Sequence, residues 1–199
     1  VSPQGGDFSE PVTQNTKRYV RTFWGLDRAL AYARHFPSIN WLTSYSEYAD
    51  DLKPWYDEHV GPEFVNSRHQ IAHLLQKESE LMEIVKLIGA DILPEDQKLV
   101  METARLIRVG FLQQNAYHAI DTYVPLDKQL RMMELILKLY HGARDIVSRA
   151  IPLSQLKATG IFESLAKMKY EVPNDHQEKF DEYDKAIDEA LRQVNEANR

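Results

Sequence analysis

The chain has no cysteine, which excludes disulfide bonds, cysteine-ligated zinc and thiol catalysis within its 199 residues. None of its eight glycines stands in the pattern G-x-x-x-x-G-K-[ST], the loop whose backbone N–H groups hold phosphates. No apolar run approaches the ~20 residues that a membrane-spanning helix needs. The formal net charge of −6 gives no support to nucleic-acid binding.

The composition is that of a folded globular chain, with 43% hydrophobic and 27% charged residues. Prolines and glycines predict a loop over residues 1–14, and aromatic and branched residues predict a strand over 19–26. Asp27 can cap a short helix that runs to His35, and Pro37 ends it. Residues 38–44 are expected to be extended.

From Ser46 onward the periodicity predicts helices. Pro54 should kink or end the first of them near Lys53. Three long amphipathic helices are expected after that break, over residues 62–88, from Pro94 to Phe111 and over 125–150, and a final one begins near Asp175. The short connection after Gly89 favours antiparallel neighbours. The sequence therefore predicts a mainly α fold, a helical bundle with a small piece of sheet at its N-terminal end.

Residues 111–123 read F-L-Q-Q-N-A-Y-H-A-I-D-T-Y and follow an amphipathic helix. The core-facing positions of that helix are Val100, Ala104, Ile107 and Phe111. Asn115 tolerates the left-handed backbone of a helix stop, which would leave Gln114 at the helix end and Tyr117 and Tyr123 on a loop. Flat aromatic faces beside amides suit a planar, hydrogen-bonding ring such as a purine. The alternative is that these aromatic side chains cover a core.

Two further groups of polar residues lie on the predicted helices. Asp91, Glu95 and Asp96 occur where two helices meet, and acids at a helix start interact favourably with its positive end, by about 0.3–1 kcal/mol each. His69 and His73 have the i, i+4 spacing of metal ligands. There is no H-E-x-x-H pattern and no evident third ligand, so no metal site is predicted.

Several motifs, in order along the chain, resemble one protein family. F-L-Q-Q-N-x-Y, followed by an aromatic residue six positions after the tyrosine, resembles the adenine-pocket segment of the catalytic A subunit of V-type and A-type rotary ATPases. The other matching segments are S-P-Q-G-G-D-F-S-E-P-V-T at 2–13, F-W-G-L-D-R at 23–28, H-F-P-S-I-N-W at 35–41, S-Y-S-x-Y at 44–48 and L-I-G-A-D-I-L-P-E-D-Q-K at 87–98. The last of these resembles the lever segment that carries D-E-L-S-E-E-D in F-type beta subunits.

The resemblance implies roles for particular residues. It places Phe36, Tyr117 and Tyr123 around an adenine ring, with Gln114 as an amide contact. It makes Asp91, Glu95 and Asp96 part of a lever that contacts the central stalk of the rotary complex. No catalytic residue is implied within this chain.

The resemblance also implies an organisation. Residues 1–45 would be the end of an α/β nucleotide-binding domain, residues 46–199 a helical bundle domain, and the chain, which begins at Val1, a C-terminal piece of a larger subunit. That subunit would bind ATP or ADP with Mg²⁺ and couple ATP synthesis or hydrolysis to ion transport, beside B subunits and central-stalk subunits, with no nucleic acid. It would be cytoplasmic and reach the membrane only through the assembled complex.

Taken alone, the piece would bind no nucleotide tightly and hydrolyse none, because it has no phosphate-binding loop. Two alternatives are a helical interaction module that binds no nucleotide and a non-catalytic B-type subunit.

Overall fold

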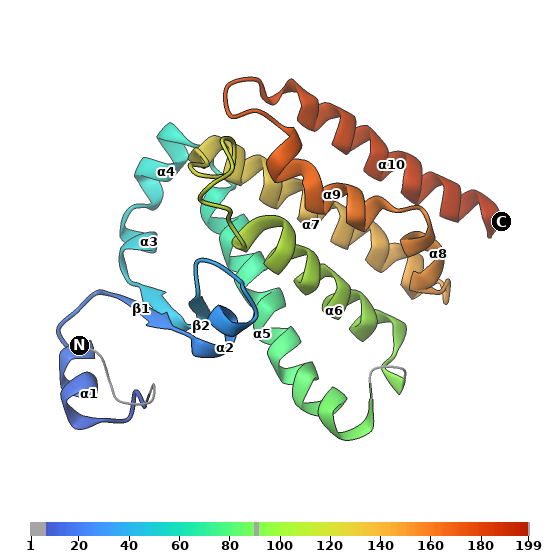
Figure 1. The fold of residues 1–199 in the computed structure, drawn as a ribbon. Helices are drawn as coiled ribbons and strands as arrows, with labels where there is room; N and C mark the ends of the chain where they lie inside the picture. Colours follow the sequence, from blue (N-terminus) through green and yellow to red (C-terminus); the bar gives the residue numbers. More distant parts are fainter. Residues whose placement is uncertain (1–6, 90–91, 199) are drawn as a thin grey trace. The chain divides into compact units, whose positions relative to one another are not determined.

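A computed structural model describes residues 7–89 and 92–198 (Figure 1). The chain divides into two compact units between Val65 and Asn66. Across the described residues, no helix combines the length and the apolar character that crossing a bilayer would require. The predicted fold class, mainly α with a small piece of sheet, is confirmed.

The first unit contains a two-stranded antiparallel sheet of β1 (Thr22–Leu26) and β2 (Ile39–Ser46). The strand predicted over 19–26 is shorter at its beginning. The loop predicted over 1–14 is wrong in its last part, because α1 (Pro11–Lys17) begins there. Pro11 stands at the start of this helix, where the missing N–H of proline has no intrahelical partner to lose.

Side-chain capping and proline set the short helices of this unit. Asp27 accepts hydrogen bonds from the N–H groups of Ala29 and Leu30 and begins α2 (Arg28–Tyr32), which ends before the predicted His35. Proline near the start of α4 (Lys53–His59) separates it from α3 (Tyr48–Asp51), as Pro54 predicted.

The second unit is a helical bundle. Its long helices are α5 (Phe64–Ile88), α6 (Glu95–Ile107), α7 (Leu126–Ser148) and α10 (Phe180–Ala197). Shorter helical segments are the π-helix η3 (Arg108–Leu112), α8 (Leu153–Ala158), α9 (Ile161–Glu171) and the 3-10 turn η4 (Gln177–Lys179). Figure 1 shows α9 and α10 side by side along α7, and each of these three helices contacts the other two.

Helix α7 is the centre of this bundle, because it contacts α6, α8, α9, α10 and η3. The sequence predicted one inward stripe on α7, and Leu130, Met133 and Leu137 are buried as expected. Burial extends beyond that stripe to Met132, Leu135, Ile136 and Leu139. A helix with partners on several sides loses its solvent face, so it is apolar over most of its circumference.

Candidate functional site

The segment with two glutamines and two tyrosines follows the π-helix η3. Helix α6 buries Val100, Ala104 and Ile107, as their spacing predicts. The chain leaves η3 at Gln113, whose backbone is extended, with φ −71° and ψ 128°. The predicted left-handed stop at Asn115 is wrong, because the non-glycine residues with positive φ in the described part of the chain are Arg34 and Ala150. The side chain of Asn115 instead accepts a hydrogen bond from the N–H of Tyr117, at 3.0 Å, and forms a local turn.

The loop between η3 and α7, residues 113–125, presents its aromatic side chains to solvent. Tyr117 is 99% exposed and Tyr123 is 75% exposed, and Gln114 is also exposed. Within the second unit, neither tyrosine covers a core. Phe36 belongs to the first unit, where it lies between α2 and β2 and is 52% exposed. All four candidate base-contact residues therefore keep side-chain surface that a ligand could meet.

Charged residues that the sequence analysis did not single out anchor this loop. Asp121, Lys128 and Lys169 are 1%, 0% and 2% exposed. Lys169, on α9, donates a hydrogen bond to the carbonyl of Gln113. The Oδ2 atom of Asp121 accepts the N–H of Asn115 at 2.6 Å and lies 4.0 Å from the Lys169 Nζ. The i, i+4 spacing from apolar Leu165 was the available signal that position 169 faces inward.

Lys128, in the first turn of α7, anchors the other end of the loop. Its Nζ donates to the carbonyls of Lys169 and Val172, at 3.1 and 2.6 Å, and to the Oδ1 atom of Asn174, at 2.9 Å. The Nδ2 group of Asn174 in turn donates to the carbonyl of Tyr123 at 2.7 Å. Burial lowers the pKa of both lysines, and the negative charge of Asp121 opposes that shift.

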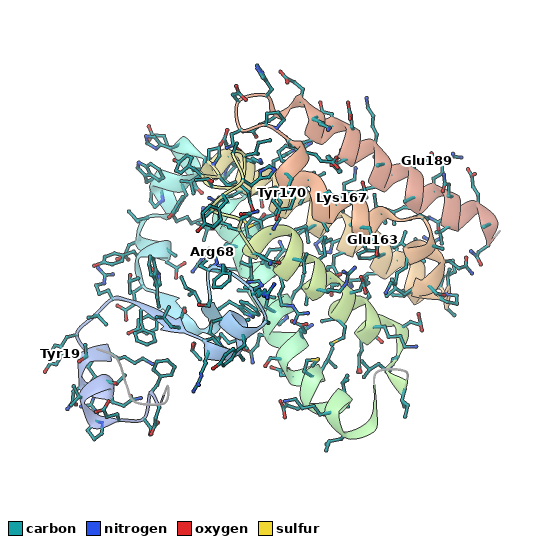
Figure 2. The ribbon with its side chains drawn as sticks, viewed as in Figure 1. Tyr19, Arg68, Glu163, Lys167, Tyr170 and Glu189 are labelled. Atoms are coloured by element: carbon teal, nitrogen blue, oxygen red, sulfur yellow. The ribbon has the colours of Figure 1, made fainter. Side chains whose placement is uncertain are left out.

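A ring contact supports the middle of the loop. Tyr170, on α9, lies beside the loop (Figure 2), and its ring centre is 4.8 Å from that of His118. The Lys169 ammonium lies 4.7 Å from the centre of the Tyr170 ring, within the range of a cation–π contact. Burial raises the pKa of Tyr170, and the charge of Asp121 adds to the shift.

The second candidate region is the turn between α5 and α6. The Nη1 atom of Arg108, in η3, lies 2.8 Å from the Oε1 atom of Glu78, on α5. This ion pair joins the two helical segments on either side of the turn. Glu78 is buried, and this oxygen has no aligned hydrogen bond. Burial raises the pKa of Glu78, although the Arg108 charge opposes the shift.

The acids predicted at this turn differ in their surroundings. Asp91 lies outside the described residues. Glu95 is half-buried, and its Oε2 atom accepts the N–H of Leu153 at 2.7 Å while Oε1 pairs with Lys98 at 2.9 Å. The hydrogen bond from Leu153, followed by that from Lys98, lowers the pKa of Glu95. Asp96 is exposed. Only Asp96, of the two described acids, leaves its carboxylate without an assigned protein partner.

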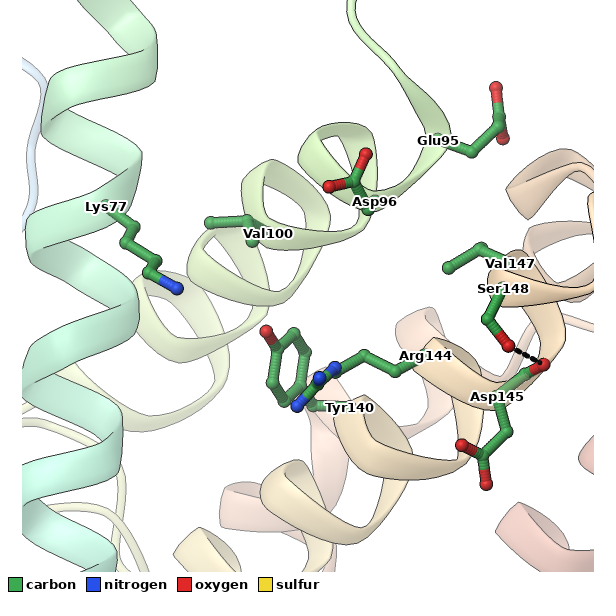
Figure 3. Close-up of a pocket in the computed structure, with 9 residues that line it drawn as sticks. All are labelled: Lys77, Glu95, Asp96, Val100, Tyr140, Arg144, Asp145, Val147 and Ser148. Atoms are coloured by element: carbon green, nitrogen blue, oxygen red, sulfur yellow. Dashed lines mark hydrogen bonds between the residues drawn. The ribbon is translucent and has the colours of Figure 1, made fainter.

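A cavity of about 560 Å³ opens beside this turn. Figure 3 shows Lys77 from α5, Asp96 from α6 and Tyr140 with Arg144 from α7 around the same space. Its lining is completed by Glu95, Val100, Asp145, Val147 and Ser148. Two cations and three carboxylates therefore share the lining, a mixture that selects no ligand of one charge sign.

His69 and His73 are both exposed on α5. Over residues 7–89 and 92–198, no three or more histidine, aspartate or glutamate side chains gather in a way that could hold a metal ion.

Comparison with known proteins assigns both parts of the chain. Residues 53–157 match the family model described as the C-terminal domain of V and A type ATP synthase. Residues 1–46 match the nucleotide-binding domain of the ATP synthase alpha/beta family. A solved structure described as a unique ATP synthase subunit NeqB from Nanoarcheaum equitans shares the fold, with a TM-score of 0.57 and 20% sequence identity over 70% of this chain and 34% of that one.

Three relatives extend the similarity over most of the sequence. The V-type ATP synthase alpha chain of Halothermothrix orenii is 50% identical over 95% of this chain and 32% of its own length. The V-type alpha chain 2 of Clostridium tetani is 54% identical over 88% of this chain and 30% of its own length, and the A subunit of the A-type ATP synthase of Methanopyrus kandleri is 48% identical over 98% and 33%. The chain thus spans about a third of the length of these relatives. The resemblance stated from the motifs is confirmed, and the chain belongs to the family of the C-terminal domain of V- and A-type ATP synthases.

Proposed function

We propose that this chain is the C-terminal part of a catalytic A subunit, which binds ATP or ADP with Mg²⁺ and couples ATP synthesis or hydrolysis to ion transport. The names of relatives that are about 50% identical over nearly the whole chain support this assignment. The observation that carries the nucleotide role is the anchored loop 113–125, which exposes Tyr117, Tyr123 and Gln114 together.

The roles proposed for this chain and for the rest of the subunit follow from the residues that this chain contains. Phe36, Tyr117 and Tyr123 supply aromatic faces to the adenine ring, and the Gln114 amide can donate to and accept from its edge. The phosphate-cradling loop and the Mg²⁺ ligands lie in the rest of the subunit, since this sequence has no G-x-x-x-x-G-K-[ST] loop. The division into residues 1–45, the end of the nucleotide-binding domain, and 46–199, the helical domain, belongs to the same proposal.

Nucleotide affinity of the full subunit tests the adenine role. Tyr117→Ala is expected to weaken ADP binding by roughly 1–3 kcal/mol, the usual contribution of an aromatic stack on a base. Tyr123→Phe is the matched control and should change little, because the ring is kept and the residue is largely exposed. Thermal unfolding is measured alongside. If Tyr117→Ala lowers the midpoint and leaves the affinity of the folded protein unchanged, the tyrosine is structural and the nucleotide role fails.

The turn between α5 and α6 is proposed to contact a central-stalk subunit, in an assembly that also contains B subunits at the membrane. Glu95 is engaged with Leu153 and Lys98, so the acids are weak candidates for a direct contact, Asp96 being the freer of the two described. The exposed apolar side chains at this turn, Leu87 and Ile92, offer surface for it. Because this chain has no cysteine, Ile92→Cys would give it a single thiol. If the turn contacts the central stalk, a cross-link from that thiol should reach a stalk subunit. Cross-links confined to neighbouring A or B subunits would remove the lever role.

The alternatives are a helical interaction module and a non-catalytic B-type subunit. The fold likeness to NeqB supports only the shared architecture at 20% identity. Both alternatives predict that Tyr117→Ala has no effect on nucleotide affinity, so the same measurement separates them from the catalytic assignment.

A further inference from the structure

We propose that Lys169 and Asp121 are positioning residues for the nucleotide loop, and that Lys128 and Asn174 position its far end. This inference rests on the proposed function, because the loop matters only if its tyrosines meet a base. The residues act on the backbone of the loop and leave its exposed side chains free.

Lys169 and Asp121 fix the backbone on both sides of Gln114. Lys169 holds the carbonyl of Gln113, and Asp121 holds the N–H of Asn115, at 2.6 Å. The side chain of Asn115 in turn accepts a hydrogen bond from the N–H of Tyr117, so the backbone at Tyr117 is held as well. The exposed amide and the exposed ring are thereby tied to one buried pair of opposite charges.

Asn174 and Lys128 fix the backbone at Tyr123. Asn174 donates to the carbonyls of Ile120 and Tyr123, at 3.0 and 2.7 Å, and its own oxygen accepts from Lys128. Lys128 also holds two carbonyls at the C-terminal end of α9, a helix end that favours a cation. The loop is therefore tied to the helix that carries Lys169.

The composition of this cluster suits orientation better than stability. Burying a charge costs free energy that an apolar residue of similar volume would avoid, so a buried pair is weak evidence for stabilisation. Here each buried charge binds a backbone group of the loop or of its supporting helix. An exposed loop has few apolar contacts to fix its conformation, and directional hydrogen bonds supply that order.

The test compares base-dependent and base-independent binding in the full-length subunit. Affinities for ADP and for inorganic pyrophosphate are measured in Lys169→Met and Asp121→Asn, with Lys167→Met as the control. Lys167 lies on the same helix and is exposed (Figure 2). We expect Lys169→Met to weaken ADP binding about tenfold, in line with the loss of one stacked ring, and to leave pyrophosphate binding unchanged. Equal weakening of both ligands, or an equal effect of Lys167→Met, overturns the inference.

A double-mutant cycle connects the buried pair to the tyrosine. If Lys169 acts through Tyr117, its substitution should have little further effect on ADP affinity in a Tyr117→Ala background. Full additivity contradicts the positioning role. If Tyr117→Ala alone has no effect, the proposed function fails first; if it weakens binding and Lys169→Met does not, only the positioning inference fails.

A measurement without nucleotide covers the case in which Lys169→Met does not fold. In Asp121→Asn, which keeps the side-chain volume, the amide hydrogen of Asn115 should exchange faster with solvent than in the unchanged protein. Unchanged exchange at Asn115 in a folded Asp121→Asn variant overturns the inference as well.

Discussion

The Oε2 atom of Glu95 accepts a hydrogen bond from the N–H of Leu153 at 2.7 Å. Leu153 is the first residue of α8, and Pro152 before it supplies no side-chain cap. The N–H groups of a first helical turn have no partner within their own helix. Glu95 thus caps a helix distant in sequence, and joins the start of α6 to the start of α8.

Glu95→Ala is expected to lower the free energy of unfolding by about 1 kcal/mol, the usual cost of losing a helix cap. Asp96→Ala, at the exposed neighbouring position, should cost less. Urea unfolding of both variants gives the comparison. A loss at Asp96 equal to that at Glu95 would show that the cap is not responsible.

Acid should remove the contribution of Glu95. Its folded-state pKa is lowered, so the stabilisation is present above the ordinary pKa of 4.5 and is lost as the pH falls through the folded-state value. Glu95→Gln carries no titrating group, and its stability should therefore fall less than that of the unchanged protein on acidification. Unfolding free energies below pH 4.5 provide the measurement.

Glu78 should have the opposite pH dependence. Burial raises its folded-state pKa above 4.5, so the folded chain holds the proton more tightly than the unfolded chain. Its contribution is greatest below pH 4.5 and is lost as the pH rises through the folded-state pKa. As the pH rises from 4.5 through the folded-state pKa of Glu78, the unchanged protein should therefore lose free energy of unfolding relative to Glu78→Gln. Glu80→Gln, at an exposed position on the same helix, is the control, and identical pH profiles for both variants would count against the prediction.

Phe162 is fully buried on α9, so Phe162→Ala should lower the free energy of unfolding by about 3–5 kcal/mol, through lost burial and the cavity left behind. Leu87→Ala is the matched control, because Leu87 is exposed on α5. Denaturant unfolding of the two variants checks the contrast. A loss below about 1 kcal/mol at Phe162 would mean that α9 is loosely packed.

The 199-residue chain on its own is expected to release no phosphate from ATP, because it contains no phosphate-binding loop. A phosphate-release assay on the purified chain checks this, and the full subunit serves for the positive control. Steady release that copurifies with the chain and survives further purification would contradict it.

Local chemistry explains what the sequence determined by itself. Apolar periodicity predicted α5, α6, α7 and α10, Asp27 predicted the start of α2, and Pro54 predicted the break between α3 and α4. The motif F-L-Q-Q-N-x-Y and the other matching segments along the chain identified the family, since such motifs depend only on residue order. Each of these signals depends on a few neighbouring residues, so it can be recognised from the sequence without knowledge of the fold.

The tertiary structure alone decided which polar residues are buried. Lys169 is distant in sequence from Asp121 and Lys128, and a lysine on a helix is ordinarily a surface residue. The two lysines bind backbone carbonyls of other segments, and Asp121 binds a backbone N–H six residues away; backbone groups carry no residue-specific signal. In the same way, Glu95 is a typical acid of a first helical turn by sequence, and only the packing of α6 beside α8 gives it Leu153 as a partner. Side-chain identity sets what a group can bind, and the fold sets which partner it meets.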